Sequence, residues 1–129
     1  MRTLVCGMPG SGKTTYCKNH LGTSGLCYDL DALAAAFRLN APHEEEHKHA
    51  RPLANELLFA FYTHVGIYSK DVFIIRTAPT IEELKRINPD QVVMCRGQYV
   101  KRGGDTQTEK RLADIERHCL WNNLPMIEA

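Results

Sequence analysis

The sequence feature that most constrains this chain is a glycine-rich segment near its start, GMPGSGKT, which spans Gly7 to Thr14. The segment matches the pattern Gly-x-x-x-x-Gly-Lys-Thr at every fixed position. Glycines in this arrangement let the backbone point several N–H groups at one anion. An apolar segment, Thr3 to Cys6, precedes it, and a segment with helical character, Lys13 to His20, follows it. The pattern therefore predicts a buried strand, a phosphate-binding loop and a helix, in that order.

Each part of the predicted loop has its own chemistry. The Lys13 ammonium can reach the β- and γ-phosphates of a nucleoside triphosphate, and the Thr14 hydroxyl can bind magnesium. The helix that begins near Lys13 adds the positive end of its dipole. We therefore expect ATP and Mg²⁺ as cofactors. The predicted nucleotide contacts are the loop and the residue after it: Gly7, Met8, Pro9, Gly10, Ser11, Gly12, Lys13, Thr14 and Thr15.

Strands and helices are predicted to alternate along the rest of the chain. Three further apolar segments have the length of buried strands: Leu26 to Tyr28, Val72 to Ile75 and Val92 to Cys95. Continuous apolar runs of this kind are typical of parallel sheets, which helices cover on both faces. We therefore predict an α/β fold of the P-loop NTPase type, with an open parallel sheet of about four strands flanked by helices.

The intervening segments carry helix signals. Asp31 is a predicted N-cap for an alanine-rich helix that ends near Leu39. Thr80 and Thr106 each open a capping box, and the Thr80 helix ends at Asn88. We expect the helix after Thr106 to bury Leu112, Ile115 and Cys119, and a helix from Pro52 to carry an apolar stripe of Leu53, Leu57, Phe61 and Val65.

Composition limits the classes of protein to consider. The 129 residues are 43% hydrophobic and 24% charged, with a net charge of +1, which indicates a single nucleotide-binding domain over residues 1–129 without a broad basic surface. We find no apolar run of membrane-spanning length and no signal peptide. Five scattered cysteines without a C-x-x-C pair indicate reduced thiols. We therefore expect a cytoplasmic protein without a membrane partner.

Two carboxylates follow the second predicted strand, at Asp29 and Asp31. Because the carboxyl ends of parallel strands meet at the ligand, these side chains are expected to face the phosphates. One could accept a proton from a substrate hydroxyl, and the other could hold magnesium. In the alternative interpretation, Asp31 only caps a helix and Asp29 only ends a strand.

Cationic residues follow the third and fourth predicted strands. Arg76 follows Ile75, where many P-loop enzymes have a magnesium-linked acid, and it could contact a phosphate or form an ordinary ion pair. Arg96 and Arg102 are candidates for contacts with the transferring phosphoryl group, because arginine binds phosphate oxygens bidentately. Gly103 and Gly104 would permit a closing lid. No N-K-x-D sequence is present to bind guanine, which disfavours a GTPase.

Three strings together resemble small P-loop kinases: GMPGSGKTT, the aspartate after the second strand, and YVKRGG before the last helix. The kinase domain of bacteriophage polynucleotide kinase is closest in layout, with shikimate- and gluconate-type kinases next. The string IIRTAPTIEEL is similar to uncharacterised ATP-binding proteins of phages and prophages. The resemblance implies that Asp31 is the general base and that Arg102 or Arg96 stabilises the phosphoryl group. The sequence departs from this pattern at Arg76.

These observations lead to one expected function and one alternative. We expect a phosphotransferase that moves the γ-phosphate of Mg-ATP to a hydroxyl of a nucleoside, nucleotide or nucleic-acid 5′ end. The acceptor would lie between the Asp31 helix and the helix from Pro52, near Arg38, Arg51 and Asn55. The alternative is a nucleotide-binding module of phage origin that has slow ATPase activity or none.

Overall fold

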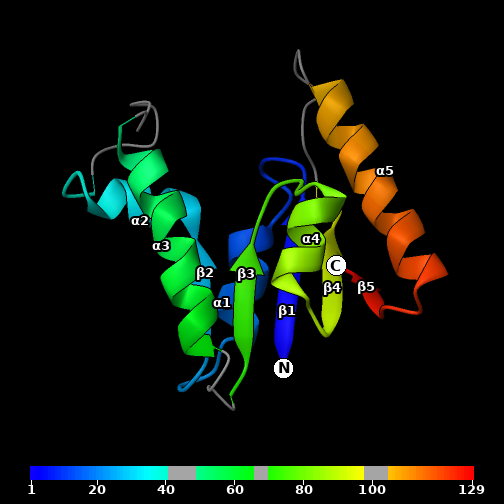
Figure 1. Ribbon diagram of the computed structural model, residues 1–129, viewed down its shortest axis with the longest axis horizontal. Helices are drawn as coiled ribbons and strands as arrows, with labels where there is room; N and C mark the ends of the chain where they lie inside the picture. The colour runs from blue at the N-terminus through cyan, green and yellow to red at the C-terminus, as the bar shows by residue number, and fades with distance from the viewer. Residues whose placement is uncertain (41–48, 66–69, 98–104) are drawn as a thin grey trace. The chain divides into compact units, whose positions relative to one another are not determined.

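The computed structural model describes residues 1–40, 49–65, 70–97 and 105–129. The chain divides into two compact units, one of Met1–Cys27 with Lys70–Ala129 and one of Tyr28–Ser69. Its elements (Figure 1) follow in the order β1 Arg2–Gly7, α1 Lys13–His20, β2 Leu26–Asp29, α2 Leu30–Ala36, α3 Ala50–Val65, β3 Val72–Ile75, α4 Ile81–Ile87, β4 Gln91–Cys95, α5 Asp105–Trp121 and β5 Met126–Glu128. A single domain over residues 1–129 stays a prediction.

The strands form a five-stranded sheet in the order β2-β3-β1-β4-β5. Strand β1 pairs in parallel with both β3 and β4, so that Leu4 lies opposite Ile74 on one side and Val92 on the other. The α/β class and the parallel sheet are confirmed. The prediction of about four strands was one too few, because β5 has only three residues, two of them exposed. It forms by pairing with β4, and the local sequence of β5 contains no pattern that predicts this pairing.

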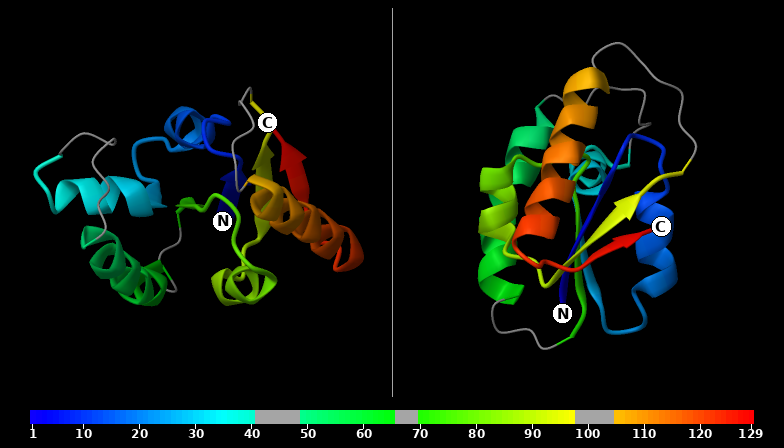
Figure 2. Two further views of the ribbon diagram at one scale, coloured as in Figure 1. Left: turned by 90° about the horizontal axis from the view of Figure 1, so that it is seen from above. Right: turned by 90° about the vertical axis from the view of Figure 1, so that its right-hand side faces the viewer.

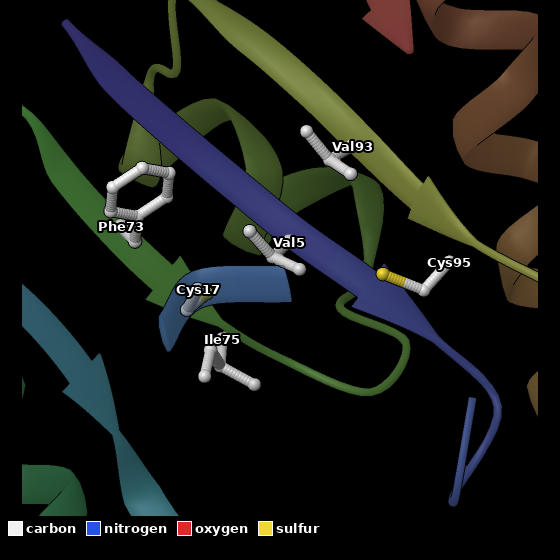
Figure 3. Packing of buried hydrophobic residues seen from close by; sticks show 6 residues of the cluster. All are labelled: Val5, Cys17, Phe73, Ile75, Val93 and Cys95. Atoms are coloured by element: carbon white, nitrogen blue, oxygen red, sulfur yellow. The ribbon is translucent and has the colours of Figure 1, made fainter. Parts of the chain in front are cut away.

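Helices cover both faces of the sheet in the first unit. Figure 2 shows α1 on one face of β1, β3 and β4, and α4 with α5 on the other. Side chains alternate between the two faces of a strand, so the faces have separate cores. Figure 3 shows the core beneath α1, where Cys17 meets side chains from all three strands; the cluster is Val5, Cys17, Phe73, Ile75, Val93 and Cys95. The opposite face buries the predicted α5 residues Leu112, Ile115 and Cys119.

The second unit is built around small residues. Ala34 of α2 clusters with Ala50 and Ala54 of α3, and each is buried. The Tyr28 hydroxyl donates a hydrogen bond to the Ala54 carbonyl at 2.9 Å, and the Tyr28 ring packs against Phe61 at 5.5 Å between centroids. Because alanines allow close approach of two helices, this contact fixes the buried face of α3.

The predicted apolar stripe on α3 was therefore wrong in part. Leu53 and Leu57 are 46% and 40% exposed, whereas Ala54 and Leu58 on the adjacent face are buried. The prediction placed the large apolar side chains of α3 in the core. In the structure, the alanine face of α3 packs against α2 and is buried instead. The predicted position Phe61 does contact the unit's core through Tyr28. The side chain of Val65 lies outside the described residues.

Element boundaries were mostly predicted correctly. The Thr80 hydroxyl accepts a hydrogen bond from the Glu83 amide at 3.2 Å, which confirms the predicted cap of α4. Helix α5 begins at Asp105, so Thr106 lies inside its first turn rather than before it. Helix α2 ends at Ala36, earlier than predicted, because the amides of Arg38 and Leu39 donate to carbonyls three residues back, at Ala35 and Ala36, rather than four.

Two predictions from composition can also be compared with the structure. All five cysteines are free thiols, as predicted. Within the described ranges, no helix has the length and apolar character needed to cross a bilayer.

Tyr28→Phe should lower the free energy of unfolding by about 1 to 2 kcal/mol, because the Ala54 carbonyl loses its buried donor. Tyr16→Phe is the matched control, since the Tyr16 ring stacks on His20 and keeps that contact as phenylalanine. Denaturant unfolding measures both variants. Equal stability of the two variants would show that the Tyr28 hydroxyl contributes nothing to the second unit.

Candidate functional site

The loop between β1 and α1 has the backbone that its glycines predict. Gly10 and Gly12 adopt φ angles of 77° and 96°, a region that side chains other than glycine disfavour. The Ser11 amide donates to the Met8 carbonyl at 3.0 Å, which closes a turn within the loop. No side chain caps α1, whose first turn follows Gly12 directly. The loop therefore presents a helix N-terminus and a tight turn at the carboxyl end of β1.

Lys13 folds back over this turn. Its Nζ donates to the carbonyl oxygens of Gly7 and Met8, both at 2.9 Å. These bonds hold the ammonium against the backbone of the loop. Thr14 and Thr15 are exposed in the first turn of α1, and Pro9 and Gly10 are exposed at the tip of the loop. A cation, a helix N-terminus and exposed hydroxyls thus converge, which is the chemistry that an anion requires.

The ends of the neighbouring strands hold the loop in place. The Gly7 amide donates to the Thr77 carbonyl after β3 at 3.0 Å, and the Gly97 amide after β4 donates to the Ser11 carbonyl at 3.1 Å. A Cβ at Gly7 would lie 2.5 Å from both the Cys95 carbonyl oxygen and Ser11 Oγ. Glycine is therefore required there by close approach. The loop is anchored on both sides by backbone that belongs to the sheet.

A cavity of about 380 Å³ adjoins the loop. The chain leaves β1 for α1 on one face of the sheet and leaves β4 for α5 on the other (Figure 2). Ligands of open α/β sheets bind where successive connections diverge in this way. The cavity lies at that point, and its walls come from the loop, the end of β4 and α5: Met8, Ser11, Met94, Cys95, Arg96, Gly97, Glu109, Leu112, Ala113 and Glu116.

Arg96, a predicted catalytic residue, lies in the wall of this cavity. Its guanidinium forms ion pairs with Glu116 of α5 and with Glu128 of β5, the latter at 3.2 Å. Two carboxylates therefore pair with the Arg96 guanidinium, which the sequence analysis expected to contact the phosphoryl group. Arg102, the other predicted catalytic arginine, and the predicted lid at Gly103 and Gly104 lie outside the described residues.

The sequence left open whether Arg76 contacts a phosphate or forms an ordinary ion pair. The Arg76 guanidinium contacts the Glu83 carboxylate at 2.5 Å, and the Arg76 side chain is only 20% exposed. Glu83 also donates its backbone N–H to the Thr80 cap. The structure thus gives Arg76 the ordinary ion pair, which ties the end of β3 to the first turn of α4.

Asp29 ends β2, as the alternative interpretation of the sequence gave it, but the predicted cap at Asp31 was wrong. Asp29, not Asp31, caps α2, because its Oδ1 accepts hydrogen bonds from the amides of Asp31 and Ala32 at 3.0 and 3.3 Å. Asp31 lies in the first turn and forms an ion pair through Oδ1 with Arg51 of α3 at 2.7 Å. Extended backbone at Asp29 makes it the N-cap; Asp31 is already helical. The predicted approach of both carboxylates to the loop relates the two units and stays a prediction.

The thiols near the loop remain protonated at neutral pH. Burial raises the pKa of Cys6 to about 12, with smaller contributions from Cys119 and Cys95. Burial also raises the pKa of Cys95, and the nearby Lys13 ammonium partly offsets this rise. Neither thiol is therefore available as an activated nucleophile.

Magnesium was predicted at Thr14 and Asp29. The described residues contain no group of three or more His, Cys, Asp or Glu side chains that could hold a metal ion. Magnesium beside nucleotides needs only one or two protein ligands, since phosphates and water supply the others. Both hydrogen bonds of the Asp29 carboxylate use Oδ1, and within the part of the chain described here Oδ2 accepts none. Magnesium at Thr14 and Asp29 stays a prediction.

The sequence analysis missed the cavity residues Met94, Glu109, Ala113 and Glu116. Glu109 was read only as part of a capping box, and its neighbours on α5 only as core or surface. Comparison of the sequence with protein-family models and with the curated proteins found no match.

Gly7→Ala should destabilise the protein by about 2 kcal/mol or more, because the new Cβ meets the Cys95 carbonyl. Gly22→Ala is the control: Gly22 also has positive φ, at 68°, but a Cβ there meets nothing within 4 Å. It should cost about 1 kcal/mol from backbone strain alone. Thermal or denaturant unfolding compares the two, and equal losses would contradict the close approach.

Proposed function

We propose that this chain binds Mg-ATP at residues Gly7 to Thr15 and transfers the γ-phosphate to a hydroxyl group. The acceptor class is a nucleoside, a nucleotide or a nucleic-acid 5′ end. The observation that carries the proposal is the loop itself. Its Lys13 side chain folds back onto the Gly7 and Met8 carbonyls, at the start of a helix that no side chain caps. This combination places positive charge and backbone donors around one anion.

In the proposed reaction, each loop residue has a defined role. Lys13 exchanges its bonds to the Gly7 and Met8 carbonyls for the β- and γ-phosphate oxygens. The backbone amides of the loop bind the same phosphates. Thr14 and Asp29 would hold magnesium, which offsets phosphate charge when it is bound. The result is a fixed electrostatic environment for the phosphoryl group, which is the main contribution a protein makes to such transfers.

Asp31 is the proposed general base. Its Oδ1 is held by Arg51, and its Oδ2 makes no hydrogen bond to other described residues. Oδ2 accepts the proton of the acceptor hydroxyl, the hydroxyl oxygen attacks the γ-phosphorus, and the bond to the β-γ bridging oxygen breaks to release ADP. Arg51 positions the carboxylate between α2 and α3, where the acceptor was predicted to bind.

A nucleotide-binding module with slow ATPase activity or none is the second candidate. Arg76 favours this candidate, because it follows β3 at the position where many P-loop enzymes have an acid that binds magnesium. Arg76 forms an ion pair with Glu83 instead. The pairing of Arg96 with Glu116 and Glu128 points the same way. The two candidates differ in whether an acceptor stimulates turnover.

ADP release from Mg-ATP distinguishes them. We expect one member of a panel of nucleosides, nucleotides and 5′-hydroxyl oligonucleotides to stimulate turnover by wild type. Lys13→Ala should lower kcat by about 10²- to 10³-fold, because it removes a donor at the transferring phosphate. Asp31→Asn should lower it by about 10²-fold or more, because it removes the base. Binding of ATP without turnover by any acceptor would leave only the module.

Substitutions at Asp29 separate its cap from its proposed metal role. Asp29→Ala should cost about 1 kcal/mol of stability, because Oδ1 caps α2. Asp29→Asn keeps an N-cap and should retain stability within about 0.5 kcal/mol. If Asp29 binds magnesium, Asp29→Asn should still raise the Mg²⁺ concentration for half-maximal turnover by about tenfold or more. An unchanged magnesium requirement in Asp29→Asn would remove Asp29 from the metal site.

A further inference from the structure

The cavity beside the loop contains a polar group that the described residues leave unsatisfied. Ser11 is only 5% exposed, and its Oγ is buried without a hydrogen-bond partner among them. Ser11 lines the cavity. A buried hydroxyl without a partner costs about 1 to 3 kcal/mol. Such a group, at the wall of a cavity, indicates that a ligand atom supplies the missing hydrogen bond.

The volume and lining of the cavity suit a small aromatic ligand. Its volume falls within the range of about 300 to 1,000 Å³ that is common for small-molecule sites. Met8 lines the cavity, and its polarisable thioether is of the kind that packs well against aromatic rings. Leu112 and Ala113 supply apolar surface from α5. The polar side chains in the wall, which can orient a ring by hydrogen bonds, are those of Ser11, Arg96, Glu109 and Glu116.

The described wall of the cavity carries charges of both signs. Glu109 and Glu116 line it, and Arg96, the one arginine among its described lining residues, is paired with Glu116 and Glu128. Carboxylate oxygens accept hydrogen bonds, and they favour a ligand that carries N–H donors. A ring with an exocyclic amino group meets both requirements.

We propose that this cavity holds the heterocyclic base of the nucleotide whose phosphates bind the loop, and that its carboxylates select bases that carry an amino group. The inference rests on the proposed function. Met8 and Ser11 belong to both the loop and the cavity wall, so one ligand can occupy the two sites together. Ser11 Oγ bonds to a ring nitrogen, and Glu109 or Glu116 accepts from the amino group.

Wild type alone provides the first test. In the presence of magnesium, isothermal titration calorimetry compares ATP, ITP and inorganic tripolyphosphate. ITP has a carbonyl in place of the adenine amino group, and tripolyphosphate has no base. We expect ATP to bind about tenfold or more tightly than either. Equal affinity for all three would overturn the base site and leave phosphate binding by the loop intact.

A variant that fills the cavity provides the second test. Ala113→Phe should weaken ATP binding by about tenfold or more and leave tripolyphosphate binding within about twofold. Leu120→Phe is the matched control, because Leu120 lies on the same helix, is 76% exposed and does not line the cavity. It should change neither affinity.

The outcomes separate this inference from the function beneath it. If wild type binds neither ATP nor tripolyphosphate, the proposed function fails and the base site fails with it. If both bind and Ala113→Phe weakens neither, only the base site is wrong. If Ala113→Phe weakens both ligands equally, the substitution has disturbed the loop, and the comparison of ATP, ITP and tripolyphosphate on wild type decides.

Discussion

Strand β1 is the part of the molecule on which the loop and the cavity depend. It is paired on both sides, with β3 and β4, and its central residues Leu4 and Val5 are fully buried. A hydrogen bond from Gly7 to Thr77 joins the carboxyl end of β1 to the segment after β3. A second, from Gly97 to Ser11, joins the loop after β1 to the segment after β4. Because the strand cannot shift without breaking two ladders, the loop that follows it starts from a fixed point. A phosphate site made mostly of backbone needs this rigidity, since its donors are useful only when they are held in advance.

Electrostatics divide the described part of the first unit into two regions. At the loop, Lys13 and the N-terminus of α1 create positive potential. In the adjoining cavity, the carboxylates of Glu109 and Glu116 line the wall, and Arg96 is paired with Glu116. A nucleotide has the matching distribution, with negative phosphates at one end and a neutral ring with N–H donors at the other. The two proposals therefore come from one charge pattern, although each is tested separately.

Much of the fold could be predicted from the sequence, because it is encoded locally. The glycine spacing predicted the loop, continuous apolar runs predicted β1, β3 and β4, and Thr80 with Glu83 predicted the start of α4. The predictions failed where the structure of a segment depends on contacts with residues far away in the sequence. Strand β5 depends on pairing with β4, and the buried face of α3 depends on alanines of α2. The sites of Arg76 and Arg96 show the same limit, since a charge in a sequence does not reveal whether Glu83 or Glu116 will neutralise it.

In the proposed function, backbone amides of the loop bind the phosphates of a nucleotide. Amide chemical shifts in a ¹H–¹⁵N NMR titration with Mg-ATP test this binding, because the shift of each amide responds to its own hydrogen bond. We predict that the largest shifts occur at Gly10, Ser11, Gly12, Lys13 and Thr14, and that the same titration of Lys13→Ala needs a much higher ATP concentration. Shifts confined to other parts of the chain, or no shifts at millimolar Mg-ATP, would show that the loop does not bind the phosphates.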